Sequence, residues 1–70
     1  MSDITLSLKH DEALVLFEWL ASLEEKELLN MYDEAEQKVL WQIEAQLESI
    51  LPDILMSDYA ARVAAAKGRL

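Results

Sequence analysis

The fold is decided by the stretch DEALVLFEWLASL, residues 11–23. Its apolar residues recur every three or four positions, which is the spacing of one face of an α-helix. A helix that is apolar on more than one side is normally buried on two sides. We therefore expect a helix over about residues 11–24 that packs both on its own domain and on a second surface. The main stripe is Ala13, Leu16, Phe17, Leu20 and Leu23, and the residues off it are Leu14, Val15 and Trp19.

Two further helices are expected, over about residues 31–50 and 58–67. Asn30 tolerates left-handed geometry and marks the break before the first of them. Pro52 ends that helix, because the residue before a proline avoids helical geometry. Ser57 or Asp58 caps the last helix, whose thin inner face is Tyr59, Val63 and Ala66. The core stripe expected of the middle helix is Tyr32, Ala35, Val39, Ile43, Leu47 and Ile50, flanked by Leu40 and Leu51, with Trp41 off the stripe.

The segment Ile4-Thr5-Leu6-Ser7-Leu8 alternates apolar and polar residues and predicts a short β-strand over about residues 4–8. No second segment alternates in this way. A lone strand leaves backbone groups that can pair with another chain. The alternative is an extended tail that packs Ile4, Leu6 and Leu8 onto the helices. The expected fold is thus mainly α, a single three-helix domain over residues 1–70 with one short N-terminal strand.

The composition favours self-association. The chain has 70 residues, of which 53% are hydrophobic, with no cysteine and one histidine. A domain this short buries only about 60% of its unfolded surface. Small domains compensate with disulfides, a metal or oligomerisation. Without cysteine, disulfides and thiolate metal sites are excluded, and one histidine makes a histidine-based zinc site improbable. We therefore expect a homodimer.

The charge is strongly acidic and unevenly placed. Residues 10–58 carry thirteen Asp and Glu against two lysines, a net of −11, whereas residues 59–70 carry three basic residues and no acid, a net of +3. Such a body repels nucleic-acid phosphates, so no nucleic acid is expected as a partner. No apolar run approaches the roughly 20 residues of a membrane span, and the N-terminus lacks the basic start of a signal peptide. The expectation is a cytoplasmic protein without a membrane partner.

No motif predicts an enzyme, a metal site or a cofactor. His10, Asp11 and Glu12 mix ligand types, but successive residues on a helix point in different directions. They are better explained as the start of a helix, where acids suit the helix dipole. The single glycine, Gly68, cannot build a phosphate loop. We therefore name no catalytic, metal or cofactor-binding residue.

The candidate interface consists of apolar residues that the expected core does not use. Trp19 and Trp41 lie off their stripes, and tryptophan is enriched among residues that anchor interfaces. The alternative is that both simply belong to the core. The full set of candidates is Ile4, Leu6, Leu8, Leu14, Val15, Trp19 and Trp41.

Two resemblances follow from these segments. The order of strand and helix over residues 4–23 resembles ribbon-helix-helix proteins, which implies dimerisation through the strand and DNA contacts from Thr5, Ser7 and Lys9. The weakly basic strand and the acidic body depart from that pattern. HDEALVLFEWL (residues 10–20) and EQKVLW (residues 36–41) are similar to segments of a family of small, uncharacterised acidic bacterial proteins, a resemblance that implies no function.

Three functional hypotheses remain. The first is a small acidic protein-interaction module of a bacterium, self-associating as a homodimer. The second is an antitoxin or immunity-type inhibitor whose negative surface binds a basic protein partner. The third, which the acidic charge disfavours, is a ribbon-type DNA-binding regulator.

Overall fold

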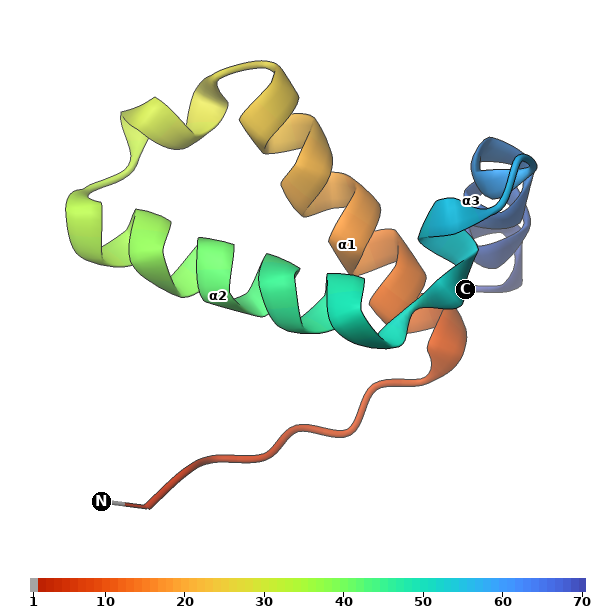
Figure 1. The fold of residues 1–70 in the computed structure, drawn as a ribbon, viewed down its shortest axis with the longest axis horizontal. Helices are drawn as coiled ribbons and strands as arrows, with labels where there is room; N and C mark the ends of the chain where they lie inside the picture. Colours follow the sequence, from red (N-terminus) through yellow and green to blue (C-terminus); the bar gives the residue numbers. More distant parts are fainter. Residues whose placement is uncertain (1) are drawn as a thin grey trace.

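A computed structural model describes residues 2–70, which contain three α-helices and two short 3-10 helices (Figure 1). The α-helices are α1 (His10–Glu25), α2 (Glu34–Ile50) and α3 (Tyr59–Arg69). The 3-10 helices are η1 (Leu28–Met31), between α1 and α2, and η2 (Pro52–Leu55), between α2 and α3. The mainly α fold class is therefore confirmed, and each predicted helix agrees with the observed one to within a few residues.

Local chemistry explains where the helices begin and end. The Glu12 carboxylate accepts a hydrogen bond from the Lys9 N–H at 2.8 Å, and Lys9 occupies the N-cap position of α1. Asp33 and Glu36 form a capping box at the start of α2, in which each side chain accepts from the other residue's N–H, at 2.8 and 3.1 Å. After α1, Glu27 adopts a left-handed conformation with φ 58° and turns the chain into η1.

Helix α1 lies at the centre of the fold, in contact with both α2 and α3 (Figure 1). Its expected stripe faces the core, although Leu16 is only partly buried. The thin inner face expected of α3 is also confirmed, since Val63 and Ala66 are buried and Tyr59 packs beside them. The buried cluster is Ala13, Leu14, Phe17, Leu20, Leu47, Leu51, Val63 and Ala66.

The buried face predicted for α2 is largely wrong. Of its expected core stripe only Leu47 is buried, while Val39 and Ile50 are 54% and 68% exposed. The helix instead packs through Leu47 together with Leu40 and the following Leu51, which we had expected only to flank the stripe. Sequence periodicity shows that a face is apolar, but it does not show which of two overlapping apolar faces meets the rest of the chain.

The N-terminal segment is extended and makes no strand within residues 2–70 (Figure 1). Ile4 is 90% and Leu6 80% exposed, so the alternative of a tail packed onto the helices is wrong for both residues. Leu8, nearer α1, is 45% exposed. Pairing of this segment between subunits stays a prediction.

Candidate functional surface

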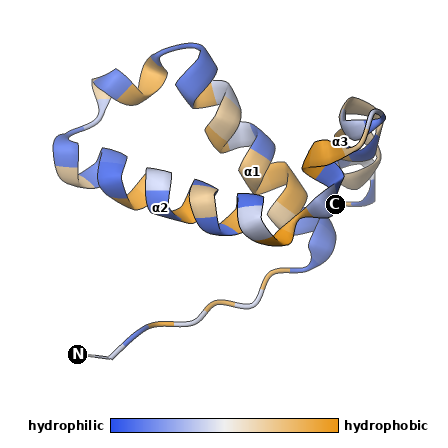
Figure 2. Ribbon diagram, viewed as in Figure 1, coloured by the Kyte–Doolittle hydropathy of each residue, from blue (hydrophilic) through white to orange (hydrophobic). Residues whose placement is uncertain are grey.

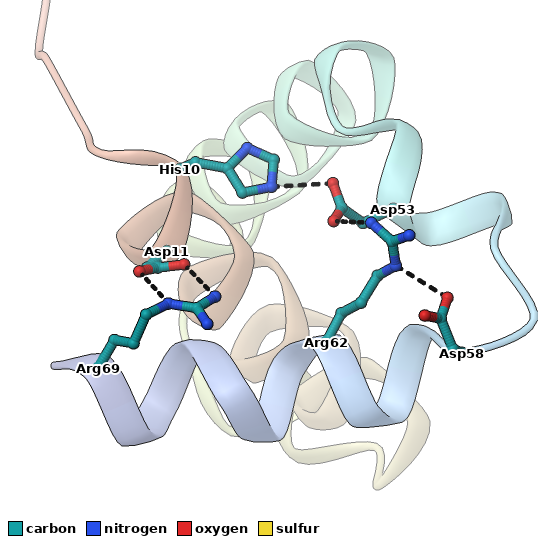
Figure 3. Close-up of polar contacts among 6 residues, drawn as sticks. All are labelled: His10, Asp11, Asp53, Asp58, Arg62 and Arg69. Carbon is teal, nitrogen blue, oxygen red and sulfur yellow. Dashed lines mark hydrogen bonds and ion pairs between the residues drawn. The ribbon is translucent and has the colours of Figure 1, made fainter.

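A polar network joins the start of α1 to η2 and α3 (Figure 3). The buried Asp53 carboxylate of η2 lies 3.0 Å from His10 Nε2 and accepts a hydrogen bond from Arg62 Nη1 at 3.2 Å. Arg62 also donates from Nε to Asp58 at 2.8 Å. Asp58 is the N-cap residue of α3, but its carboxylate binds the Arg62 side chain and accepts no capping hydrogen bond from the backbone.

The pKa values in this network follow from its contacts. Burial raises the pKa of Asp53, but hydrogen bonds from His10 and Arg62 together outweigh it, so the pKa lies below the usual 3.8. A second ion pair closes the ends of α1 and α3, where Arg69 donates from Nε and Nη2 to both oxygens of Asp11 at 2.8 Å. That bidentate contact lowers the pKa of Asp11.

These contacts give the network a structural role. Each side chain in it already has a partner within the fold, and together they tie α1 to η2 and α3, which lie far from α1 in sequence (Figure 3). Within residues 2–70 no group of three or more His, Cys, Asp or Glu side chains is placed to hold a metal ion. In the same range no helix combines the length and apolar character needed to cross a membrane.

An apolar groove opens between α1 and α2, beside the connection through η1. Its volume is about 440 Å³. Trp19 lines it from α1, and the α2 side contributes a mainly apolar wall with one carboxylate. Figure 2 shows hydrophobic segments mainly where α1 and α2 approach each other, and a mainly hydrophilic ribbon where the two helices diverge toward this connection. The residues lining this groove are Trp19, Tyr32, Ala35, Glu36, Val39 and Leu40.

A second hollow lies along α1, with Lys67 of α3 at its border. Its volume is about 460 Å³, and it is more polar than the groove because three charged side chains border it. Trp19 lines both hollows and so separates the apolar surface from the charged one. The residues around the second hollow are Val15, Glu18, Trp19, Ser22, Glu25 and Lys67.

The structure divides the predicted interface residues into four groups. Leu14 is only 1% exposed and belongs to the core, so its assignment to a surface is wrong. It lies beside the main stripe of α1, a helix that contacts both α2 and α3, and it belongs to the same buried cluster as Val63 and Ala66. Val15 and Trp19 come together at the second hollow. Trp41 is half-exposed and lines neither hollow, and Ile4, Leu6 and Leu8 lie on the extended segment.

The exposed apolar residues of α2 were not expected from the sequence. Val39, Ile43 and Ile50 were expected in the core, yet all three are exposed. A sign of this was present in the sequence: Leu40 and Leu51, which flank the expected stripe, form a second apolar row at helical spacing together with Leu47. One helix of a small domain cannot bury both rows when the rest of the chain covers only one side of it.

A pair of carboxyl groups bridges α1 and α2. Glu44 is half-buried on α2, facing Glu24 of α1. Burial raises the pKa of Glu44 to about 7, with further contributions from its contact with Glu24 and from the charge of Glu48. Near neutral pH this carboxyl is therefore partly protonated.

Comparison with known proteins adds no relative. No protein-family model matches the chain, and neither curated proteins nor solved structures include a significant match.

Proposed function

We propose that this protein is a small acidic protein-interaction module that associates with itself. One observation carries the proposal: the folded chain leaves large apolar side chains uncovered on several elements. Leaving such residues in water forfeits about 1.5–3 kcal/mol for each side chain that a partner would bury fully. They include Ile4 and Leu6 in the N-terminal segment, Trp19 in α1, and Val39, Trp41 and Ile50 in α2.

The exposed apolar residues of α2 adjoin the groove between α1 and α2. Single exposed hydrophobic residues need no explanation, but contiguous apolar patches mark interaction sites. Here the groove is continuous with exposed residues of α2, since Val39 belongs to both. Tryptophan and tyrosine, which contribute most strongly to interfaces, line the same groove.

Sedimentation velocity over a range of concentrations tests self-association directly. We expect the chain, of 8.0 kDa, to sediment as a dimer at tens of micromolar and to dissociate on dilution. A folded monomer at all concentrations up to hundreds of micromolar would exclude the proposal. Circular dichroism on the same samples verifies that the species measured is folded.

A second candidate is an antitoxin or immunity-type protein that binds a basic partner. The observation that favours it is the pairing of the C-terminal cations: Arg62 and Arg69 are both engaged with carboxylates of their own chain. Most of the acidic residues of α1 and α2 therefore remain available to an outside partner. Such binding should weaken steeply as salt rises, because charge complementarity mainly sets association rate and specificity. A complex that is indifferent to salt between 50 and 500 mM would argue against this candidate.

A ribbon-type DNA-binding regulator is the weakest of the three. It requires residues 4–8 to pair as a strand between subunits, and only Lys9 adds positive charge there. The DNA hypothesis predicts that Lys9→Ala abolishes binding. Absence of any DNA retention by the wild-type protein at low salt would exclude it.

A further inference from the structure

We propose that the interface for self-association is the exposed face of α2, packed antiparallel against the same face of a second copy. This inference rests on the proposed self-association and names the surface that performs it. The face is defined by Val39, Ile43 and Ile50, with the groove at one end. Their spacing of four and seven residues places them in one row along the helix.

The first argument is the charge of the surroundings. On a helix, the neighbours of a side chain are the residues three and four positions away. For Val39, Ile43 and Ile50 the neighbours within α2 include only one charged residue, Glu36. In a chain of net charge −8, a face with so little charge is suited to contact with an equally acidic copy of itself. The neighbours, apart from the row itself, are Ala35, Glu36, Leu40, Gln42, Gln46 and Leu47.

Trp41 gives the contrast on the same helix. It is exposed to a similar degree, but its neighbours include Lys38 and Glu44. A basic partner would bind best where carboxylates lie beside exposed apolar side chains. The row of Val39, Ile43 and Ile50 has only one such carboxylate, that of Glu36. The row therefore favours a second copy over a basic protein.

The second argument is the shape of the face. The groove lies at its N-terminal end, where Val39 is part of the wall, and the highly exposed Ile50 stands at its C-terminal end. A two-fold axis across the middle of α2, between Ile43 and Gln46, brings Ile50 of each copy to the groove of the other. In such a dimer both copies use the same patch, so the interface is self-complementary and no second patch is left to bind a third copy.

The antiparallel direction follows from the same residues. In a parallel pair the two grooves would face each other, and each Glu36 would approach its own copy. The antiparallel pair separates the two Glu36 carboxylates to opposite ends and opposes the two helix dipoles favourably. From Val39 to Ile50 the row is about 17 Å long, at about 1.5 Å per residue. Trp19 and Tyr32 widen the contact at each end, where they line the groove.

Ile43→Glu tests the interface, because it places two new carboxylates near the two-fold axis. The matched control is Ala45→Glu, which adds the same charge to an exposed position on another side of α2. We expect sedimentation to show a dimer for the wild type and for Ala45→Glu. For Ile43→Glu we expect a dissociation constant raised about 100-fold or more, from the loss of two buried apolar side chains.

A cross-linking experiment tests the antiparallel α2 interface even if Ile43→Glu fails to fold. The chain has no cysteine, so Gln46→Cys and Ala45→Cys each provide a single thiol. With a short bis-maleimide, Gln46→Cys should cross-link efficiently as a dimer, and Ala45→Cys should not. Equal cross-linking at both positions, or none at Gln46→Cys in a dimeric sample, would overturn the antiparallel α2 interface.

The outcomes separate this inference from the proposed function. A monomeric wild type refutes self-association, and with it the interface. A dimer that survives Ile43→Glu in folded form but is lost in Leu6→Asp would leave self-association intact and assign it to the N-terminal segment. A dimer lost in Ile43→Glu and kept in both Ala45→Glu and Leu6→Asp supports the α2 interface.

Discussion

The carboxyl pair between α1 and α2 leads to a sharp prediction about stability and pH. Glu44 is half-buried, and its pKa is raised from 4.5 to about 7, first by burial and then by its contact with Glu24. Between those two pH values the folded chain holds a proton that the unfolded chain has released. Stability therefore falls as pH rises through this window, since the folded state binds more protons there.

The size of the effect follows from the size of the shift. At about 1.4 kcal/mol per pKa unit, the full shift would correspond to roughly 3 kcal/mol. Glu44 is partly open to water, which screens its interaction with neighbouring carboxylates, so we expect about 1 kcal/mol. Glu44→Gln removes the titration and stays neutral at every pH. The variant should match the wild type closely at pH 5 and exceed its free energy of unfolding by about 1 kcal/mol at pH 8.

Urea unfolding at a fixed protein concentration, at pH 5 and pH 8, measures this difference. The window avoids acid titration of Asp11 and Asp53, whose pKa values are lowered below 3.8. Glu34→Gln is the control, because it removes the same charge from an exposed position of the same helix. The reasoning is refuted if Glu44→Gln shifts stability equally at both pH values, or if the control reproduces its pH dependence.

Three further variants test other parts of the fold. Leu14→Ala should cost about 2.5–4 kcal/mol in chemical denaturation, and a loss below about 1 kcal/mol would contradict its place in the core. Glu27→Gly should raise the free energy of unfolding by about 0.5–1 kcal/mol, because glycine adopts the left-handed conformation without strain, while the helical control Glu25→Gly should lower it. Asp53→Asn should lower the Tm more than Asp58→Asn, because Asp53 is buried with two partners. That difference should disappear as the pH falls through the lowered pKa of Asp53, and a persistent difference in strong acid would show that charge is not its cause.

The helices could be predicted well because their signals are local. Pro52, the Asp33–Glu36 capping box and the dense apolar spacing of residues 11–23 act within one or two turns. The candidate surface could be predicted only in part. Trp19, Ile4 and Leu6 were correctly placed outside the core, whereas Leu14 was not. The contact between His10 and Asp53 joins residues more than forty positions apart, and no local sequence pattern predicts it.

The sequence alone determined that the chain is helical, acidic and too apolar to hide all of its hydrophobic residues in a domain of this size. Periodicity and capping set the helices, and composition set the surplus of apolar surface. Only the tertiary structure decided where the surplus lies. Helix α1 has two neighbours in the chain and buries Leu14, whereas α2 rests on α1 through Leu40 and Leu47 and exposes Val39 and Ile50. Which of two apolar faces is covered depends on the direction from which a neighbour approaches, and that direction is set by contacts distant in sequence.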